Sequence, residues 1–200
     1  MTQLQIINLA LVHQGSATLT QSALDNLSDP ASLAANVLWE PCRDEVLGSA
    51  RWSFATVTQT LSVIDNIIDA EYDYVYTHPT LSVGAIWCVF NEGSVDTKED
   101  NEFELRYAPT LTLSVIYTNE ADAIAEYTYK VTSPAVWSDS FNMAFSYLLA
   151  SRMCAATTGD VDKSLKLGQI YSSLISDSKR IGASEKRKKP KETSNYLNAR

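Results

Sequence analysis

Histidine and glycine are scarce in this sequence, which holds 2 His and 7 Gly in 200 residues. The glycine-rich signatures GxGxxG and GxxxxGKS/T, which cradle dinucleotides and phosphates, do not occur, and neither does the GxSxG of serine hydrolases. His13 is predicted to end a helix, where it interacts with the helix dipole, and His78 lies between a strand and a turn. No acid, base and nucleophile stand out as a group, so we expect no enzyme, cofactor or metal site.

Long apolar runs and cysteines are also few. No segment is apolar over the length of a transmembrane helix, and the N-terminal apolar residues are spaced for one helix face rather than for a signal peptide. The 3 cysteines, Cys42, Cys88 and Cys154, each lie in an apolar pattern. This favours buried, reduced thiols over disulfides or metal ligands, and it fits a chain assembled in a reducing cytosol.

Lysine and arginine are rare in the body of the chain. Residues 1–178 hold 8 Lys and Arg against 22 Asp and Glu, a net charge of −14, whereas residues 179–200 hold 8 against 2, a net charge of +6. Phosphate neutralisation depends on Lys and Arg, so an acidic body argues against wrapping nucleic acid. It does not argue against passing DNA through a hole.

The densest acidic segment is residues 91–104, which predicts a solvated loop or hairpin tip. Its acids can attract calcium, but the glycine and the spaced final glutamate of an EF-hand are missing. These candidate acids are Asp96, Glu99, Asp100 and Glu102.

Helical spacing opens the chain. Thr2 and Gln5 are spaced as a capping box and Gly15 is a natural stop, which together predict a short first helix. Residues 16–29 are rich in Ser, Thr, Asn and Asp and predict a loop that packs back on the helices. Its apolar anchors are Leu19, Leu24 and Leu27.

A longer helix is predicted over residues 28–48. Ser28 or Asp29 caps it, and Pro30 suits its first turn. Pro41 lies inside it and removes one backbone donor, which predicts a kink or a local restart. The predicted apolar stripe is Ala34, Leu38, Cys42 and Val46.

After two aromatic anchors, Trp52 and Phe54, the pattern changes to period two. Apolar and polar residues alternate between residues 56 and 131, which predicts half-buried antiparallel strands. Residues 83–90 are apolar on both faces, as in a central strand or one sealed against a neighbouring subunit. The alternating positions are Val57, Leu61, Val63, Phe103, Leu105, Tyr107, Leu111, Leu113, Val115, Tyr117, Tyr127, Tyr129 and Val131.

Helical spacing returns at Ser138, the expected cap of a helix. Residues 158–160, Thr-Gly-Asp, predict a tight stop before an antiparallel last helix, whose start Asp160 and Asp162 favour through the dipole. The apolar stripe of the earlier helix is Phe141, Phe145, Leu148, Leu149, Met153 and Ala156. That of the last helix is Val161, Leu165, Leu167, Ile170, Tyr171, Leu174 and Ile181.

Two helices, a strand region and two helices predict an α+β fold, a four-helix bundle with an inserted antiparallel β-sheet and an extended C-terminal arm. Residues 1–55 and 134–182 form the bundle in this prediction, residues 56–133 the insertion and residues 183–200 the basic arm. Tyrosines crowd the strand region, and two interpretations stay open: cross-strand packing and a subunit interface. They are Tyr72, Tyr74, Tyr76, Tyr107, Tyr117, Tyr127 and Tyr129.

Several segments form a set that covers most of the chain from residue 4 to about residue 184. They are ALVHQG at 10–15, RDEVL at 43–47, WSFA at 52–55, YDYVYTHP at 72–79, residues 105–107 with 127–134, and FNMAFSYLLASR at 141–152. Taken together they resemble the tail tubular protein A and head–tail adaptor family of tailed bacteriophages. Arg51 departs from that pattern, because the family commonly has proline there. Thr80 and Leu81 also depart from it, where members often have an acidic residue and a cysteine.

The resemblance implies a non-enzymatic structural protein of the virion. Members form a ring, typically of twelve subunits, between the portal protein and the tail nozzle or tube, and repeated heterologous contacts close such a ring. Genome DNA crosses the central channel without sequence-specific binding, and an acidic lining would repel its phosphates. The expected location is the neck or tail of the virion, after assembly in the host cytoplasm and without a membrane.

The basic C-terminal segment has three interpretations: a solvated terminus, a DNA contact, or docking on a partner. Adaptor subunits use an extended C-terminal segment to reach along the portal ring, so the resemblance favours portal docking. Two apolar anchors after the basic run agree with it. The expected docking residues are Lys186, Arg187, Lys188, Lys189, Lys191, Tyr196 and Leu197.

A rival hypothesis is a tail accessory module that binds host-surface carbohydrate through exposed tyrosines. A lone monomer with affinity for glycans would favour it. A third hypothesis, a tail-associated hydrolase, lacks a supporting set of catalytic residues in the sequence.

Overall fold

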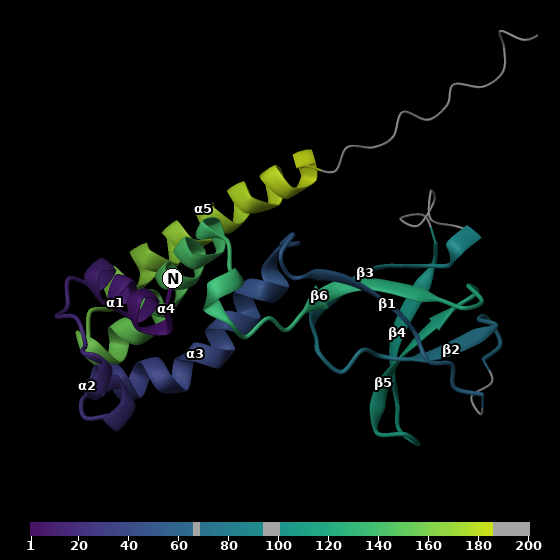
Figure 1. The fold of residues 1–200 in the computed structure, drawn as a ribbon, viewed down its shortest axis with the longest axis horizontal. Helices are drawn as coiled ribbons and strands as arrows, with labels where there is room; N and C mark the ends of the chain where they lie inside the picture. Colours follow the sequence, from purple (N-terminus) through teal and green to yellow (C-terminus); the bar gives the residue numbers. More distant parts are fainter. Residues whose placement is uncertain (66–68, 94–100, 186–200) are drawn as a thin grey trace, which may run out of the picture.

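Helices and strands occupy opposite ends of the molecule (Figure 1). The computed structural model describes residues 1–65, 69–93 and 101–185, with residues 181–185 described by backbone alone. We call the helices the helical part and the six strands the strand part. The predicted α+β class is confirmed.

The first helix, α1 (Gln3–Gln14), begins and ends as predicted. Thr2 and Gln5 form the capping box, and Gly15 takes a left-handed conformation with φ 73°. The prediction of a plain loop over residues 16–29 is wrong, because Thr20 caps a short helix, α2 (Gln21–Asn26). Leu24 is the buried anchor of this segment.

The next helix, α3 (Pro30–Ser49), is capped by Asp29. Its carboxylate accepts hydrogen bonds from the backbone N–H groups of Ala31 and Ser32. The predicted restart is wrong, since the helix runs on through Pro41. Pro41 cannot donate to the carbonyl of Val37, but both residues are exposed and water can bind that carbonyl.

The buried face of α3 is turned slightly from the predicted stripe. Cys42 and Val46 are buried as predicted, whereas Ala34 and Leu38 are only partly buried. Ala35 and Trp39 take the centre of the face. The large indole therefore decides which side of the helix meets the core.

The strands form two three-stranded antiparallel sheets, where the sequence predicted one. One sheet has the order β1-β6-β3 and the other β2-β5-β4. They pack on each other through a shared core that includes Val89 and Tyr127 from the first sheet and Tyr76 and Ile116 from the second. The bounds are β1 (Thr56–Thr60), β2 (Tyr74–Thr77), β3 (Ser82–Phe90), β4 (Phe103–Ala108), β5 (Leu113–Thr118) and β6 (Ile124–Tyr129).

The strand that is apolar on both faces, β3, lies at an edge of its sheet, so the prediction of a central strand is wrong. Ile86 and Val89 face the second sheet, while Val83 packs against the helical core. Gly84, with φ 75°, lies against Gly48 of α3, and a Cβ on Gly84 would stand 2.6 Å from the Gly48 Cα. Within one chain, β3 therefore packs against both the second sheet and the helical core.

A short 3-10 helix, η2 (Pro134–Val136), leads into α4 (Asp139–Thr157), and α5 (Val161–Glu185) follows after Gly159, which has φ 66°. Ser138 caps α4 as predicted. The predicted stripe of α4 is buried except for Ala156. The predicted stripe of α5 is wrong at three positions: Leu167 is buried and Tyr171 and Leu174 are partly buried, but Val161, Leu165 and Ile170 are exposed.

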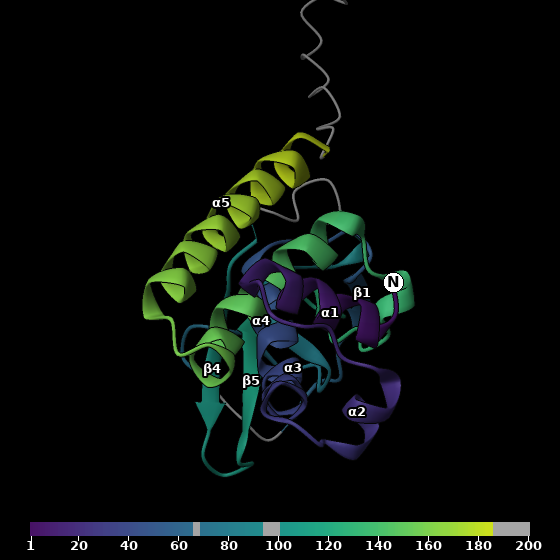
Figure 2. The ribbon, with the colours of Figure 1, turned by 90° about the vertical axis from the view of Figure 1, so that its left-hand side faces the viewer.

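Part of the predicted stripe of α5 is exposed because this helix lies along the outside of the helical part (Figure 2). It packs on α4 with one side, and Ile175 is a second buried contact on that side. Nothing is described of the side chain of Ile181.

Helices from before and after the strands contribute to one hydrophobic core. Ile6 and Leu11 of α1, Trp39 of α3, Phe141 of α4 and Ile175 of α5 belong to it. Aromatic rings meet in its centre: the Trp39 ring lies 4.8 Å from that of Phe145, and both contact Trp137. The division of the chain into domains at residues 55, 134 and 182 stays a prediction.

Candidate functional site

The predicted docking residues of the arm lie outside the described residues, so portal docking stays a prediction. They are Lys186, Arg187, Lys188, Lys189, Lys191, Tyr196 and Leu197. Asp96, Glu99 and Asp100 of the acidic segment also lie outside them. Glu102 is described and is exposed just before β4.

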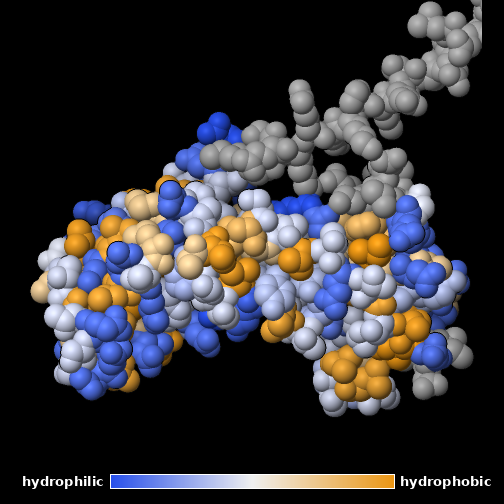
Figure 3. Space-filling view, in the orientation of Figure 1, coloured by the Kyte–Doolittle hydropathy of each residue, from blue (hydrophilic) through white to orange (hydrophobic). Residues whose placement is uncertain are grey.

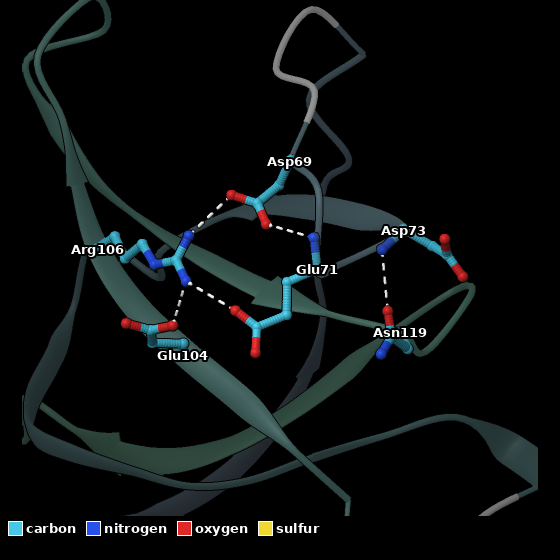
Figure 4. Close-up of polar contacts among 6 residues, drawn as sticks. All are labelled: Asp69, Glu71, Asp73, Glu104, Arg106 and Asn119. Atoms are coloured by element: carbon cyan, nitrogen blue, oxygen red, sulfur yellow. Dashed lines mark hydrogen bonds and ion pairs between the residues drawn. The ribbon is translucent and has the colours of Figure 1, made fainter.

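A polar cluster of three carboxylates surrounds Arg106 of β4 (Figure 4). Its guanidinium donates to Asp69 at 2.8 Å and to Glu104 at 2.5 Å, and it lies 3.5 Å from the carboxylate of Glu71. The same guanidinium also lies 4.8 Å from the centroid of the Tyr117 ring. We call these residues the Arg106 cluster.

Local structure places each member of the Arg106 cluster. Glu104 and Arg106 are two residues apart on β4 and therefore lie on one face of the sheet. The backbone N–H of Glu71 donates to Asp69 at 2.9 Å, which holds the carboxylate toward Arg106. The same loop is held again where the N–H of Asp73 donates to the side chain of Asn119 at 2.9 Å (Figure 4).

The electrostatics of this cluster follow from its hydrogen bonds. The N–H of Glu71 and the charge of Arg106 lower the pKa of Asp69. The hydrogen bond from Arg106 lowers the pKa of Glu104, and the same pair raises the pKa of Arg106. Carboxylates held ionised beside a guanidinium join two chain segments. The cluster therefore fixes the segment before β2 on β4.

Sequence reasoning missed this cluster. The available signal was that Arg106 is the sole arginine between residues 52 and 151, in a region rich in acids. Such an arginine has several possible carboxylate partners, and the sequence does not say which of them the fold brings near.

A second candidate surface is the end of the β4–β5 hairpin, residues 105–113. Tyr107 is 63% exposed, and three leucines nearby are 38–43% exposed. Figure 3 shows an apolar projection below the strand part, where Figure 1 places this hairpin. The leucines are Leu105, Leu111 and Leu113.

The exposure of the hairpin end contradicts the predicted burial of these positions. The core between the two sheets includes Ile116 and Phe103, whereas Leu105 and Tyr107 lie farther along the hairpin and are exposed. Buried Tyr76 and Tyr127 agree with the packing interpretation of the tyrosines, and exposed Tyr107 is available for a contact. The packing interpretation holds for the buried tyrosines, and the subunit-interface interpretation stays a prediction.

A third candidate surface is a groove between α4 and α5 with a volume of about 420 Å³. Two mutual hydrogen bonds join the helices beside it: the Ser151 hydroxyl donates to the Ser164 carbonyl at 2.9 Å, and the Ser164 hydroxyl donates to the Ser151 carbonyl at 2.8 Å. Leu165, 62% exposed, forms part of its wall. The lining residues are Ser151, Ser164, Leu165, Gly168, Gln169 and Ser172.

Ion pairs join the helical part to the strand part. Lys130 lies 3.0 Å from Asp44, and Arg51 pairs with buried Glu126 while its guanidinium lies 5.8 Å from the Trp87 ring. Arg51 therefore has a defined partner in the strand part. Asp44 and Glu45 of α3 thus both form ion pairs, since Glu45 lies 3.1 Å from Arg152.

The histidines and cysteines have structural environments. His13 stacks on Tyr147 with ring centroids 3.9 Å apart, and burial lowers its pKa. His78 Nδ1 lies 3.0 Å from the carbonyl of Pro79. The predicted burial of free thiols is confirmed, and burial raises the pKa of Cys42 to about 11. The three thiols are those of Cys42, Cys88 and Cys154.

Over the described ranges, His, Cys, Asp and Glu form no group of three or more placed to hold a metal ion. None of the helices in the part of the chain that the structure describes has both the length and the apolar character of a membrane span. Comparison with protein-family models and with curated proteins finds no match to this chain.

Proposed function

We propose that this chain is a structural adaptor of a tailed bacteriophage, a neck protein that forms a ring beneath the portal and leaves a channel for genome ejection. One observation carries most of the support: helices from both ends of the chain share one core, and the strand part is held against it. Such a body has two distinct ends that can meet two different neighbours. The sequence resemblance supplies their identity.

In this proposal α1, α3, α4 and α5 act as a four-helix bundle that faces the portal. The strand part faces the tail nozzle or tube. The basic arm, residues 183–200, reaches the portal. Ion pairs such as Lys130 with Asp44 keep the two ends of the subunit in a fixed relation.

The acidic body suits a channel for DNA. Residues 1–178 carry a net charge of −14. Acidic groups repel phosphates, so DNA slides through such a ring without adhering. No sequence-specific contact is required for this role.

The test is to locate the chain in the virus particle. Cryo-electron microscopy of the virion is expected to show it as a ring of about twelve copies at the neck, with twelve taken from the resemblance. Imaging of the purified protein with and without portal protein would then show whether the portal templates the ring. Density for this chain anywhere other than the neck overturns the proposal.

Exposed Tyr107 supports the second candidate function, a tail accessory module that binds host carbohydrate. In that case the purified chain is a monomer that binds glycans, and Tyr107→Ala abolishes the binding. Absence of glycan binding by the wild-type protein removes this alternative.

A further inference from the structure

The negative charge of the body is concentrated in the strand part. Residues 56–133 hold 3 Lys and Arg against 13 Asp and Glu, a net charge of −10, which leaves −4 for the rest of residues 1–178. Five described carboxylates lie in the Arg106 cluster or within two residues of it, and with Arg106 they carry a net charge of −4. They are Asp69, Glu71, Asp73, Glu102 and Glu104. A positively charged segment is therefore attracted to the start of β4.

The other end of β4 is apolar. Residues 107–119 contain no Asp, Glu, Lys or Arg, and Tyr107 and Leu113 are exposed there. Because β4 lies at an edge of its sheet, a segment along it can touch Glu104 on one face and Tyr107 on the other. One strand thus presents an acidic end followed by an apolar end, which together we call the β4 surface.

The C-terminal segment carries complementary groups in the same order. Residues 186–191 hold five Lys and Arg, and Tyr196 and Leu197 follow. Over residues 186–200 there are 6 Lys and Arg against 1 Glu, a net charge of +5. Outside residues 186–191, no six consecutive residues of the chain hold more than 2 Lys and Arg. Within this chain, the C-terminal segment is therefore the occupant that matches the β4 surface.

The spacing of the anchors also fits. Glu104 and Tyr107 are three residues apart on β4, which is about 10 Å along the strand. Lys191 and Tyr196 are five residues apart, which allows up to about 17 Å in an extended chain. The basic residues can thus lie beside the carboxylates while the tyrosine reaches the apolar end.

The direction of the chain agrees with this order. In Figure 1 the C-terminal end of α5 lies on the upper side of the molecule, toward the strand part, and the β4–β5 hairpin hangs below the strand part. A segment that leaves α5 therefore meets the acidic start of β4 before its apolar end. Fifteen extended residues span about 50 Å. The longest strand, β3 with 9 residues, measures about 30 Å, so the segment can cross the strand part.

We infer that residues 186–200 dock on the β4 surface of the same chain. The basic run lies on the carboxylates around Arg106, and Tyr196 and Leu197 lie on Tyr107 and Leu113. This contact belongs to the free subunit. In the proposed adaptor the portal protein takes the arm away from the strand part and so uncovers the hairpin end, and this release step alone rests on the proposed function.

Trypsin cleavage of the full chain tests the contact. Trypsin cuts after Lys and Arg in accessible, extended segments, so a docked basic run is cut more slowly than a free synthetic peptide of residues 183–200. Intact-mass spectrometry at low salt is expected to show loss of the arm at least tenfold more slowly than cleavage of the peptide. Salt at about 0.5 M should bring the two rates closer, because it screens the attraction between exposed charges.

Two double variants of the β4 surface are expected to speed the loss of the arm at least fivefold. Glu71→Gln with Glu102→Gln removes charge, and Tyr107→Ser with Leu113→Ser removes the apolar end. All four residues are exposed, so both variants should keep the wild-type thermal melt.

A change in the arm itself leaves the folded body untouched. Tyr196→Ser with Leu197→Ser is expected to speed cleavage as much as the change at the apolar end of β4. The matched controls lie on exposed positions of the helical part and should cleave like the wild type. They are Asp25→Asn with Asp162→Asn for charge and Leu33→Ser with Val37→Ser for apolar surface.

A wild-type arm that is cut as fast as the free peptide overturns the inference, and so do controls that speed cleavage as much as the β4 variants. A rate that falls as the protein is concentrated places the arm on another copy and overturns the contact within one chain. Failure of the proposed function is a separate outcome. A protected arm in a chain that lies outside the neck leaves the contact standing and removes the adaptor role, and a freely cut arm in a neck protein does the reverse.

Discussion

Trp52 joins the end of α3 to the helical core. Its indole is 5% exposed, donates to the carbonyl of Val46 at 2.8 Å and lies 5.1 Å from the Phe141 ring. Trp52→Ala is expected to lower the free energy of unfolding by about 3–5 kcal/mol, because it leaves a cavity in a packed aromatic cluster. Urea denaturation followed by fluorescence of the remaining tryptophans or by circular dichroism measures the loss.

Val37→Ala is the control, since this side chain is 69% exposed on α3, the helix that Trp52 follows. Its expected effect is below about 0.5 kcal/mol. A similar loss for both variants would show that the buried Trp52 side chain contributes no more to the free energy of unfolding than an exposed side chain does.

Gly84 of β3 lies against Gly48 of α3, where the backbones of the two parts come close together. An alanine at this position would be strained, because the backbone has a left-handed φ of 75°. Its Cβ would also lie 2.6 Å from the Gly48 Cα. Gly84→Ala is expected to lower the free energy of unfolding by about 2–4 kcal/mol, from strain and overpacking together. Gly159→Ala separates the two causes, because Gly159 has φ 66° and open space around it, and about 1 kcal/mol is expected. Equal losses in urea melts would show that β3 can move away from α3.

Local features of single residues were predictable from sequence. The caps at Thr2 and Ser138 and the stop at Gly15 depend on neighbours within a few positions, and the structure has all three. The burial of Trp39 in place of Leu38 was not predictable. It depends on Trp137, which contacts Trp39 from a distant part of the chain.

Among the elements, the Arg106 cluster makes stability depend on pH. The pKa of Asp69 is lowered in the folded chain, so the unfolded chain binds protons more readily. The stabilisation is complete above the unfolded pKa of about 3.9 and is lost as the pH falls through the lowered folded value. Asp69→Asn is therefore expected to reduce the urea midpoint at pH 7 and to reduce it progressively less as the pH falls below about 3.9.

Asp73→Asn is the control for this prediction, because it changes an exposed carboxylate in the same segment while the N–H contact to Asn119 remains. Its midpoint should match the wild type at both pH values. A pH-independent loss for Asp69→Asn would mean that the ion pair to Arg106 does not stabilise the fold.

The sequence predicted most strands but not their partners. The alternation of apolar and polar residues predicts that β4 and β5 are half-buried. It does not predict which face of these strands the other sheet covers, or how far along the strands that contact extends. Leu105 and Ile116 are partners across β4 and β5, and only Ile116 is buried. The exposed hairpin end, and the groove beside Gly168, therefore came from the arrangement of elements in space.

At the scale of the whole molecule, charge separates the body from the arm. Removal of residues 183–200 is expected to leave the subunit folded, because the described core ends with Ile175. The shortened chain is expected to fail to attach to portal protein, with a pull-down as the measurement. Its thermal melt should match that of the full chain.

Two full-length variants show which residues of the arm are needed for attachment to portal protein. One replaces the basic residues between 186 and 191 with glutamine, and the other replaces Tyr196 and Leu197 with serine. If the shortened chain joins filled heads as the wild type does, the arm has no part in attachment.

The strand part has its entry and exit at one point. The N–H of Tyr129 donates to the carbonyl of Ala55 at 2.7 Å, and Thr56 pairs with Thr128 across β1 and β6. A segment whose ends are this close can be exchanged by recombination for another with the same spacing, and the sequence of the helical core is then untouched. In the proposed adaptor, such an exchange would change the tail-facing end of the subunit and leave the portal-facing end as it is.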